Sequence, residues 1–255
     1  MSDSLSLHAL PNFPLVEPGD NLAEAITESL TDAGLLLQSG DVLVVAQKII
    51  SKAENRYAYL NHIEVSDEAK SLAQSTEKDP RVVQLILDES VEVVRYRPGA
   101  IIVEHKLGYV HANAGIDQSN IESDDTNQRV LLLPENPDAS ASELRKKLVH
   151  HAGVELGVII NDSAGRAWRN GTLGFAIGSA GFEPVVDLVG KKDLFGRELE
   201  VTSVAVADEL AAAASFLMGQ AAEAVPVVLI RGAALVSSDV GSTSLIRHRD
   251  QDLFR

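Results

Sequence analysis

The chain has 255 residues, of which 45% are hydrophobic and none is cysteine, and its formal net charge is -15. Nucleic acids and anionic membrane surfaces are unfavourable partners for so acidic a chain, because binding to either usually needs a concentrated basic face. The lack of cysteine excludes disulfides, thiolate zinc sites and cysteine nucleophiles, which leaves oxygen-rich sites as the form of metal binding to consider.

Length and apolar content predict one compact unit over residues 1–240, built as one or two lobes, followed by a flexible polar tail over 241–255. The first segment, MSDSLSLHALPNFPLVEPGD, has acidic residues and prolines where a secretory signal needs a basic start and an unbroken apolar run. No run approaches the roughly 18 apolar residues needed to span a bilayer. We therefore expect a cytoplasmic protein with no membrane partner.

The first predicted helix follows a Pro-Gly turn, is capped by Asp20 and covers residues 22–30, where apolar residues recur at helical spacing. Residues 42–46 (VLVVA) are short, apolar and β-branched, which is typical of a strand buried on both faces. The next predicted elements are two helices and two strands, over residues 67–75, 80–92, 93–96 and 100–105.

Polar residues follow directly after the buried strand: Gln47, Lys48, Ser51 and Lys52. Ends of buried strands commonly hold ligands in α/β proteins, which favours a binding role for this group. Two solvated lysines are an equally acceptable interpretation of the same spacing.

The rest of the chain continues the alternation of strands, loops and helices. A polar loop is predicted over 108–120, and an acidic loop tip (ESDDTNQR) over 122–129. The strand predicted at 158–160 should stop at Asn161. The other predicted elements are strands over 130–133 and 227–230, a turn over 134–140, and helices over 142–153 and 201–224.

Familiar nucleotide and hydrolase motifs are missing from this α/β pattern. The sequence contains no G-x-x-x-x-G-K-[ST] loop, no G-x-G-x-x-G fingerprint after a strand, no H-E-x-x-H and no G-x-S-x-G. A P-loop NTPase, a Rossmann dehydrogenase, a zincin and an α/β-hydrolase are therefore disfavoured.

Three acidic or amide clusters lie in loops or after apolar runs: Asn113 with Asp117 and Asn120, Asp162 with Ser163, and Asp208 with Glu209. An Asp-Ser pair at a strand end offers carboxylate and hydroxyl oxygens, which suit Mg²⁺ or Mn²⁺. An ordinary turn or helix cap explains Asp162 and Ser163 about equally well. Asp208 and Glu209 open a predicted helix, where the helix dipole alone favours carboxylates.

Two ring side chains and a basic region are weaker candidates. His111 could act as an acid or base, but a single histidine in a loop more often does neither. Trp168 could stack on a heterocycle or could be a partly buried aromatic. The central third of the chain is locally basic, as a polyphosphate site would be, although solvated surface residues explain it too: Arg166, Arg169, Lys191, Lys192 and Arg197.

Several longer motifs are specific in combination. They are residues 50–54 (ISKAE), 112–120 (ANAGIDQSN), 162–166 (DSAGR), 192–197 (KDLFGR), and 207–214 (ADELAAAA) with Met218-Gly219. Together with residues 10–16 (LPNFPLV) and 226–232 (PVVLIRG), they make the chain resemble the coenzyme F420-0:L-glutamate ligases, also called F420 gamma-glutamyl ligases. The resemblance covers most of the chain.

The resemblance implies a mixed α/β fold of the gamma-glutamyl ligase type and a homodimer. It also implies a GTP-dependent, GDP-forming ligase of coenzyme F420 biosynthesis. Such an enzyme activates the carboxylate of the deazaflavin F420-0 as an acyl phosphate, which the amine of L-glutamate attacks, and later glutamates join through γ-linkages. Two divalent ions, Mg²⁺ or Mn²⁺, with K⁺ as a further candidate, would screen the two reacting anions from each other.

Individual residues match positions of the family pattern. Asp117, Asp162 and Ser163 match catalytic metal ligands, and Gln220 matches a further ligand. The residues that match nucleotide contacts are Phe13, Pro14, Leu15, Val16, Gln47, Lys48, Lys52, Asn120, Phe216, Leu217, Met218, Gly219 and Gln220. The last five belong to a matching segment that runs from Phe216 to Glu223.

Two departures leave the nucleotide preference open: Asn55-Arg56 stands where Gly-Arg is expected, and Gln47-Lys48 where smaller hydroxyl residues can occur. Two other functions also stay open. One is a related NTP-dependent amide ligase for another acid or amino acid, and the other is a nucleotide- or cofactor-binding protein without catalysis.

Overall fold

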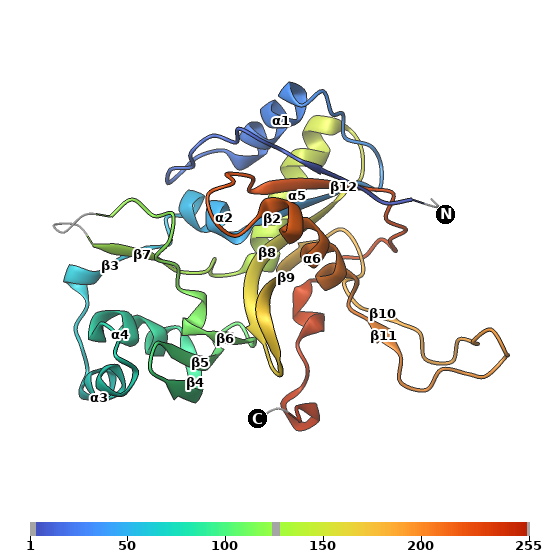
Figure 1. The fold of residues 1–255 in the computed structure, drawn as a ribbon. Helices are drawn as coiled ribbons and strands as arrows, with labels where there is room; N and C mark the ends of the chain where they lie inside the picture. The colour runs from blue at the N-terminus through green and yellow to red at the C-terminus, as the bar shows by residue number, and fades with distance from the viewer. Residues whose placement is uncertain (1–3, 124–127, 254–255) are drawn as a thin grey trace.

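The computed structural model describes residues 4–123 and 128–253 (Figure 1). The α-helices are α1 (Leu22–Asp32), α2 (Gln47–Ala53), α3 (Asp67–Thr76), α4 (Pro80–Asp88), α5 (Pro137–Ala152) and α6 (Val206–Met218). The strands are β1 (Ser6–Ala9), β2 (Val42–Ala46), β3 (Tyr57–Tyr59), β4 (Ser90–Arg97), β5 (Ala100–His105), β6 (Val110–Ala112), β7 (Arg129–Leu131), β8 (Gly157–Arg166), β9 (Arg169–Ala180), β10 (Val186–Asp187), β11 (Ser203–Val204) and β12 (Val227–Arg231). Short 3-10 helices are η1 (Leu60–His62), η2 (Asn113–Gly115), η3 (Ser242–Leu245) and η4 (Arg249–Gln251).

A five-stranded sheet forms the centre of the molecule, in the order β1-β12-β2-β8-β9. Within this sheet β2 and β8 run parallel, with Ala46 opposite Asn161 at the end of their pairing, and the other neighbours are antiparallel. The sheet is therefore mixed, as the resemblance implied, and it is neither a Rossmann nor a P-loop arrangement.

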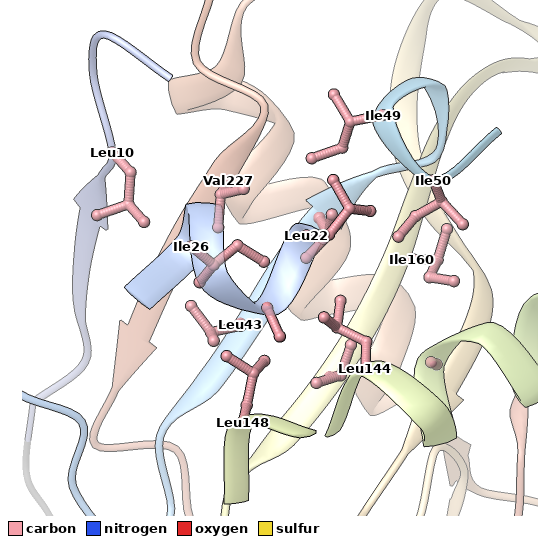
Figure 2. Packing of buried hydrophobic residues seen from close by; sticks show 14 of the residues in the cluster. Leu10, Leu22, Ile26, Leu43, Ile49, Ile50, Leu144, Leu148, Ile160 and Val227 are labelled. Carbon is pink, nitrogen blue, oxygen red and sulfur yellow. The ribbon is translucent and has the colours of Figure 1, made fainter. Parts of the chain in front are cut away.

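Both faces of the sheet are covered, which explains the unbroken apolar run of β2. Leu43 and Val45 join one hydrophobic cluster with residues of α1 and α5, such as Ile26 and Leu148 (Figure 2). Val42 and Val44 face the opposite cluster, to which α6 contributes its alanine-rich side. Side chains alternate across a strand, so a strand covered on both sides has no polar position.

A second set of elements has a hydrophobic cluster of its own. It consists of α3, α4, the β3–β7 pair and the β4-β5-β6 sheet, and it lies to one side of the central sheet (Figure 1). Its core includes Ile86 and Ile101, both fully buried. Whether residues 1–240 act as one domain in solution stays a prediction.

The C-terminal segment contacts the body of the protein at Asp138, in the first turn of α5. Oδ1 of Asp138 accepts from the backbone N–H of Ser242 at 2.8 Å and of Ser179 in β9 at 2.9 Å. The Ser242 hydroxyl donates to the carbonyl of Ile177 at 2.8 Å. The flexibility of residues 241–255 stays a prediction.

A long excursion connects β10 with β11 and extends away from the body (Figure 1). We call residues 188–202 the arm. Leu194 and Phe195, near its tip, are 97% and 95% exposed.

One strand prediction was wrong in a way that matters for the site. The strand predicted to stop at Asn161 continues as β8 to Arg166, because β9, a glycine-containing strand that was not predicted, pairs with it along its length. A shift in register lies between Ile160 and Asn161. Asp162 and Ser163 are therefore strand residues and not turn or cap residues.

Three helix predictions were wrong at their ends. The helix predicted over 80–92 ends at Asp88, and residues 90–92 belong to β4, where Val91 is exposed. The helix predicted over 201–224 is confined to α6, and Gly219 with φ of 73° ends it. The helix predicted over 142–153 begins earlier, at Pro137, with Asn136 as its cap, and so replaces the predicted turn.

Smaller differences concern the loops. The loop predicted over 108–120 contains β6 and η2, and the predicted tip over 122–129 lies partly outside the described residues. The first helix is preceded by Asn21 at the cap position, and Asp20 accepts from the N–H of Glu17 instead. In the part of the chain that the structure describes, no helix is both long and apolar enough to cross a bilayer.

Candidate active site

The candidate site lies at the end of the parallel pairing between β2 and β8. β2 passes directly into α2, so Gln47 and Lys48 leave the sheet beside Asn161 and Asp162 of β8. Ligands commonly bind at the carboxyl ends of parallel strands. A recess of about 110 Å³ lies here, lined by Ala46, Gln47, Lys48, Asp117, Asn161, Asp162, Ser163 and Gln220.

Asp117 reaches the recess from the other set of elements. Its backbone exchanges two 2.9 Å hydrogen bonds with Leu131, which fixes the chain at this point. Its Oδ2 accepts from Nε2 of Gln47 at 2.6 Å, and its Oδ1 lies 3.3 Å from Nζ of Lys48. The Ser51 hydroxyl donates to Oε1 of Gln47 at 3.0 Å, so the amide of Gln47 presents its NH₂ group to Asp117.

The electrostatics of Asp117 favour a cation in the recess. Burial raises the pKa of this carboxyl group, and the nearby Asp162 carboxylate raises it further, whereas Lys48 and Gln47 act in the opposite direction. A cation bound between the two carboxylates would offset both their mutual repulsion and the burial of Asp117.

Asp162 is held from two sides. Its Oδ1 accepts from the N–H of Ser163 at 2.8 Å, and its Oδ2 lies 3.2 Å from Nε2 of His111. Burial lowers the pKa of His111, but Asp162, the Ala112 carbonyl and Asp117 together raise it more, and the net shift is upward.

Two lysines connect α2 to the loop that follows Asp117. Nζ of Lys48 donates to the carbonyl and hydroxyl of Ser119, both at 3.2 Å, and Nζ of Lys52 donates to the carbonyl of Asn120 at 3.1 Å. The Asn120 side chain donates to the carbonyl of Ala221 at 3.1 Å. Burial, with the charge of Lys48, lowers the pKa of Lys52. Segments far apart in sequence thus meet around one recess.

Gln220 enters the recess immediately after α6. The helix ends at Gly219, and the amide of Gln220 donates to the Ser215 hydroxyl at 3.1 Å, so its oxygen stays available. A side chain at Gly219 would meet the Glu223 carboxylate, and Glu223 in turn accepts from the N–H of Ala221 at 2.8 Å. This turn carries the chain from α6 to β12.

The donors present fit a hard divalent cation. Asp117, Asp162, Ser163 and Gln220 offer carboxylate, hydroxyl and amide oxygens, which Mg²⁺ and Mn²⁺ prefer. Across the described ranges, no three His, Asp or Glu side chains gather as a metal site. Such a donor set fits the way Mg²⁺ is usually held, by one or two carboxylates together with waters and substrate phosphates.

The structure brings together some of the residues predicted to touch a nucleotide and separates others. Gln47, Lys48, Lys52, Asn120 and Gln220 lie in or beside the recess. Phe13, Val16 and Met218 have buried side chains, so a ligand could reach only their backbone, whereas Pro14, Leu15, Phe216 and Leu217 are exposed. Their roles, like that of Gly219, stay predictions.

Other sequence candidates have structural partners elsewhere. Asp208 accepts from the N–H of Ala176 at 2.9 Å, which stabilises α6 against β9, and Asn113 accepts from the N–H of Ile101 at 3.2 Å. Trp168 is exposed in the turn between β8 and β9. Neither Asp208 nor Asn113 lines the recess.

Sequence reasoning missed Asn161 and the contact between His111 and Asp162. Asn161 was taken as the residue that ends a strand, yet it is buried and lines the recess, with its Oδ1 lacking a hydrogen-bond partner. Its position next to Asp162 was the available signal. Nothing in the spacing of residues 111 and 162 indicated their contact.

Larger hollows occur elsewhere but differ from the recess in composition or in the burial of their charged side chains. One of about 360 Å³ is lined mainly by leucines and threonines near the end of α1, and its one ionisable side chain is that of His151. Another, of about 200 Å³, is also lined by carboxylates and a lysine, but Glu54 is bonded there to the Ser140 hydroxyl and the exposed Glu143 is paired with Lys147. The carboxylates of Asp117 and Asp162 are largely buried at the end of the parallel strand pair, so position and burial, and not size, identify the candidate site.

Fold and recess together define a mixed α/β protein with an acidic, oxygen-rich binding site at the end of its parallel strand pair. The family model described as F420-0:Gamma-glutamyl ligase matches residues 12–232, and the chain belongs to this family. Among its relatives, a Coenzyme F420:L-glutamate ligase of Methanothermobacter thermautotrophicus is 46% identical over 98% of this chain and 99% of the relative. Proteins of the same name from Methanopyrus kandleri and Methanocaldococcus jannaschii are each 44% identical, over 99% and 95% of this chain and 98% and 94% of theirs.

Proposed function

We propose that this chain joins L-glutamate to the carboxylate of the deazaflavin F420-0, with GTP as the energy source and GDP as a product. The observation that carries the proposal is the recess in which Asp117 and Asp162 face one another beside Lys48. The near full-length similarity to relatives named Coenzyme F420:L-glutamate ligase supports the choice of substrates.

The proposed reaction has two group transfers. A carboxylate oxygen of F420-0 attacks the γ-phosphorus of GTP, an O–P bond forms, and the bond to GDP breaks to leave an acyl phosphate. The neutral amine of glutamate then attacks the acyl carbon, the amide bond forms, and phosphate leaves while the amine gives up a proton. Further rounds at the γ-carboxylate of the added glutamate extend the chain.

The residues of the recess have distinct parts in this proposal. Asp117, Asp162, Ser163 and Gln220 would hold two divalent ions, Mg²⁺ or Mn²⁺, which when bound screen the repulsion between the γ-phosphate and the attacking carboxylate. A site for K⁺ is a further part of the proposal.

Lys48 and Lys52 supply positive charge to an otherwise acidic recess, since their Nζ atoms lie along the loop after Asp117. We assign them to the phosphates of the nucleotide. Lys48 already offsets part of the charge of Asp117, from which it is 3.3 Å away, and can exchange that partner for a phosphate oxygen.

A homodimer in the cytoplasm completes the proposal. The exposed Leu194 and Phe195 of the arm support a partner of the same kind, because apolar side chains clustered on a projecting segment commonly mark an interface. Light scattering on the purified chain gives its mass directly. A monomer at working concentrations would contradict this part of the proposal and leave the reaction untouched.

The reaction is tested by incubating the purified chain with F420-0, L-glutamate, GTP and Mn²⁺ or Mg²⁺. We expect products heavier by glutamyl units in mass spectrometry, together with GDP. Screens of other nucleotides, acids and amino acids separate this function from a related amide ligase. No glutamyl product with any nucleotide would refute the proposal.

Asp162→Ala separates a ligase from a protein that only binds its ligands. Turnover should fall by at least about 100-fold, because transition-state charge stabilisation is lost, whereas a pure binder would only bind more weakly. Asp32→Ala, at an exposed position in α1, is the matched control and should keep full activity. Full activity in Asp162→Ala would refute the assignment of Asp162 to the metal.

A further inference from the structure

His111 lies behind Asp162, on the side away from the open recess. Its ring is 7% exposed, and it does not line the recess. Nδ1 lies 2.8 Å from the carbonyl of Ala112. A carbonyl oxygen can only accept a hydrogen bond, so Nδ1 donates. Nε2 lies 3.2 Å from Oδ2 of Asp162, a close contact without the alignment of a hydrogen bond.

This contact completes the restraint of the Asp162 carboxylate. One oxygen accepts from the N–H of Ser163 at 2.8 Å, and the other faces His111. The terminal torsion of an aspartate is otherwise broad, so a carboxylate with one restrained oxygen can still rotate. With one oxygen hydrogen-bonded and the other in contact with a buried ring, rotation of the carboxylate is restricted before any ligand arrives.

The ring of His111 is held by the fold itself. It comes from β6, where His111 is opposite Val103 of β5, and its ring lies 5.7 Å from that of Phe175. Phe175 is the cross-strand partner of Asp162 in β9. The strand that pairs with β8 at Asp162 therefore also contacts the ring of His111.

Burial alone does not explain this arrangement, as His105 in the neighbouring strand shows. His105 is also buried, and its Nδ1 accepts from the N–H of Leu107 at 3.0 Å. The nearest carboxylate oxygen to its Nε2, on Glu89, is 3.9 Å away, beyond hydrogen-bond distance. A histidine buried in this part of the protein thus need not have a carboxylate within hydrogen-bond distance of its Nε2. The contact between His111 and Asp162 is therefore not a consequence of burial alone.

We propose that His111 is a positioning residue that fixes the carboxylate of Asp162 for binding a divalent cation. The inference rests on the proposed function, which assigns Asp162 to the metal. Residues that orient metal ligands from behind commonly change metal affinity about 10- to 100-fold when they are replaced. His111 itself does not touch substrate.

Three variants test this. His111→Phe keeps a ring against Phe175 but removes the contact, and His111→Gln restores an NH₂ group at the reach of Nε2. His105→Phe is the matched control, because it removes another buried histidine ring that has no contact with Asp162. Mn²⁺ binding to the full chain is measured from the electron paramagnetic resonance signal of free Mn²⁺, and thermal unfolding confirms that each variant is folded.

We expect Mn²⁺ binding to weaken about 10- to 100-fold in His111→Phe, to recover at least in part in His111→Gln, and to stay at the parent value in His105→Phe. Equal affinity in His111→Phe and the parent would overturn the inference, as would a parent that binds no Mn²⁺. The product assay is read separately. Loss of Mn²⁺ affinity without any glutamyl product in the parent would refute the proposed function while the role of His111 stands.

Discussion

His105 should make the protein less stable as the pH falls below neutrality. Burial, aided by the nearby His111, Lys106 and Arg56, lowers the pKa of His105 from 6.5 to about 4. At pH values above 6.5 the His105 ring is neutral in both the native and the unfolded protein. Between these two values the unfolded chain binds a proton that the native protein does not, so the free energy of unfolding decreases as the pH decreases.

The magnitude follows from the two pKa values of His105. With 6.5 in the unfolded chain and about 4 in the native protein, the loss from about pH 7.5 to about pH 5.5 is about 1 kcal/mol. Both conditions lie above the isoelectric point near 4.8, where low net charge would favour precipitation.

Urea unfolding of the parent, His105→Asn and His62→Asn at both pH values measures this effect. The asparagine oxygen at position 105 can still accept from the N–H of Leu107, and the variant no longer titrates. The parent should lose about 1 kcal/mol more than His105→Asn. His62 is exposed, so His62→Asn should behave like the parent. Equal losses in the parent and His105→Asn would refute the reasoning.

Two further predictions concern stability, each measured by urea unfolding. A Cβ at Gly174 would lie 2.4 Å from Oδ1 of Asn161, so Gly174→Ala should cost about 1–3 kcal/mol. Gly165→Ala, in open space in the partner strand, is its control, and equal effects of the two changes would contradict the steric argument. Arg231→Leu should cost about 3–5 kcal/mol, because it leaves the buried carboxylate of Asp41, now 2.7 and 2.8 Å from the guanidinium, without its charge partner. Lys70→Ala, at an exposed ion pair, should change stability by less than about 1 kcal/mol, and a similar cost for both would count against the role of burial.

Local sequence patterns predicted the helices and strands that are determined by residues close together in the chain. The β-branched run of β2 identified a doubly covered strand, and helical spacing identified α1. The extent of β8 was not predictable in this way, because its polar half from Asn161 onward is held in the strand by β9, whose glycines carry no strand pattern. Pairing between distant segments decided that boundary.

The residues of the candidate site were likewise predictable only where local sequence marked them. The polar residues after β2 and the Asp162-Ser163 pair could be recognised as candidates, because each lies next to an apolar run. The meeting of Asp117 with Gln47 and Lys48, about 70 residues earlier in the chain, depends on tertiary structure. In the sequence, only the resemblance to a family linked these residues, and their spacing did not.

The place of β12 in the central sheet has a consequence for synthesis of the chain. β12 lies between β1 and β2, so one of the last strands to leave the ribosome separates two of the first. Until residues 227–231 emerge, β1 lacks its neighbour and one edge of β2 is uncovered, which is a hazard for association between nascent chains. The sheet closes only after β12 emerges, and a chain truncated before Val227 would lack the strand that pairs with both β1 and β2.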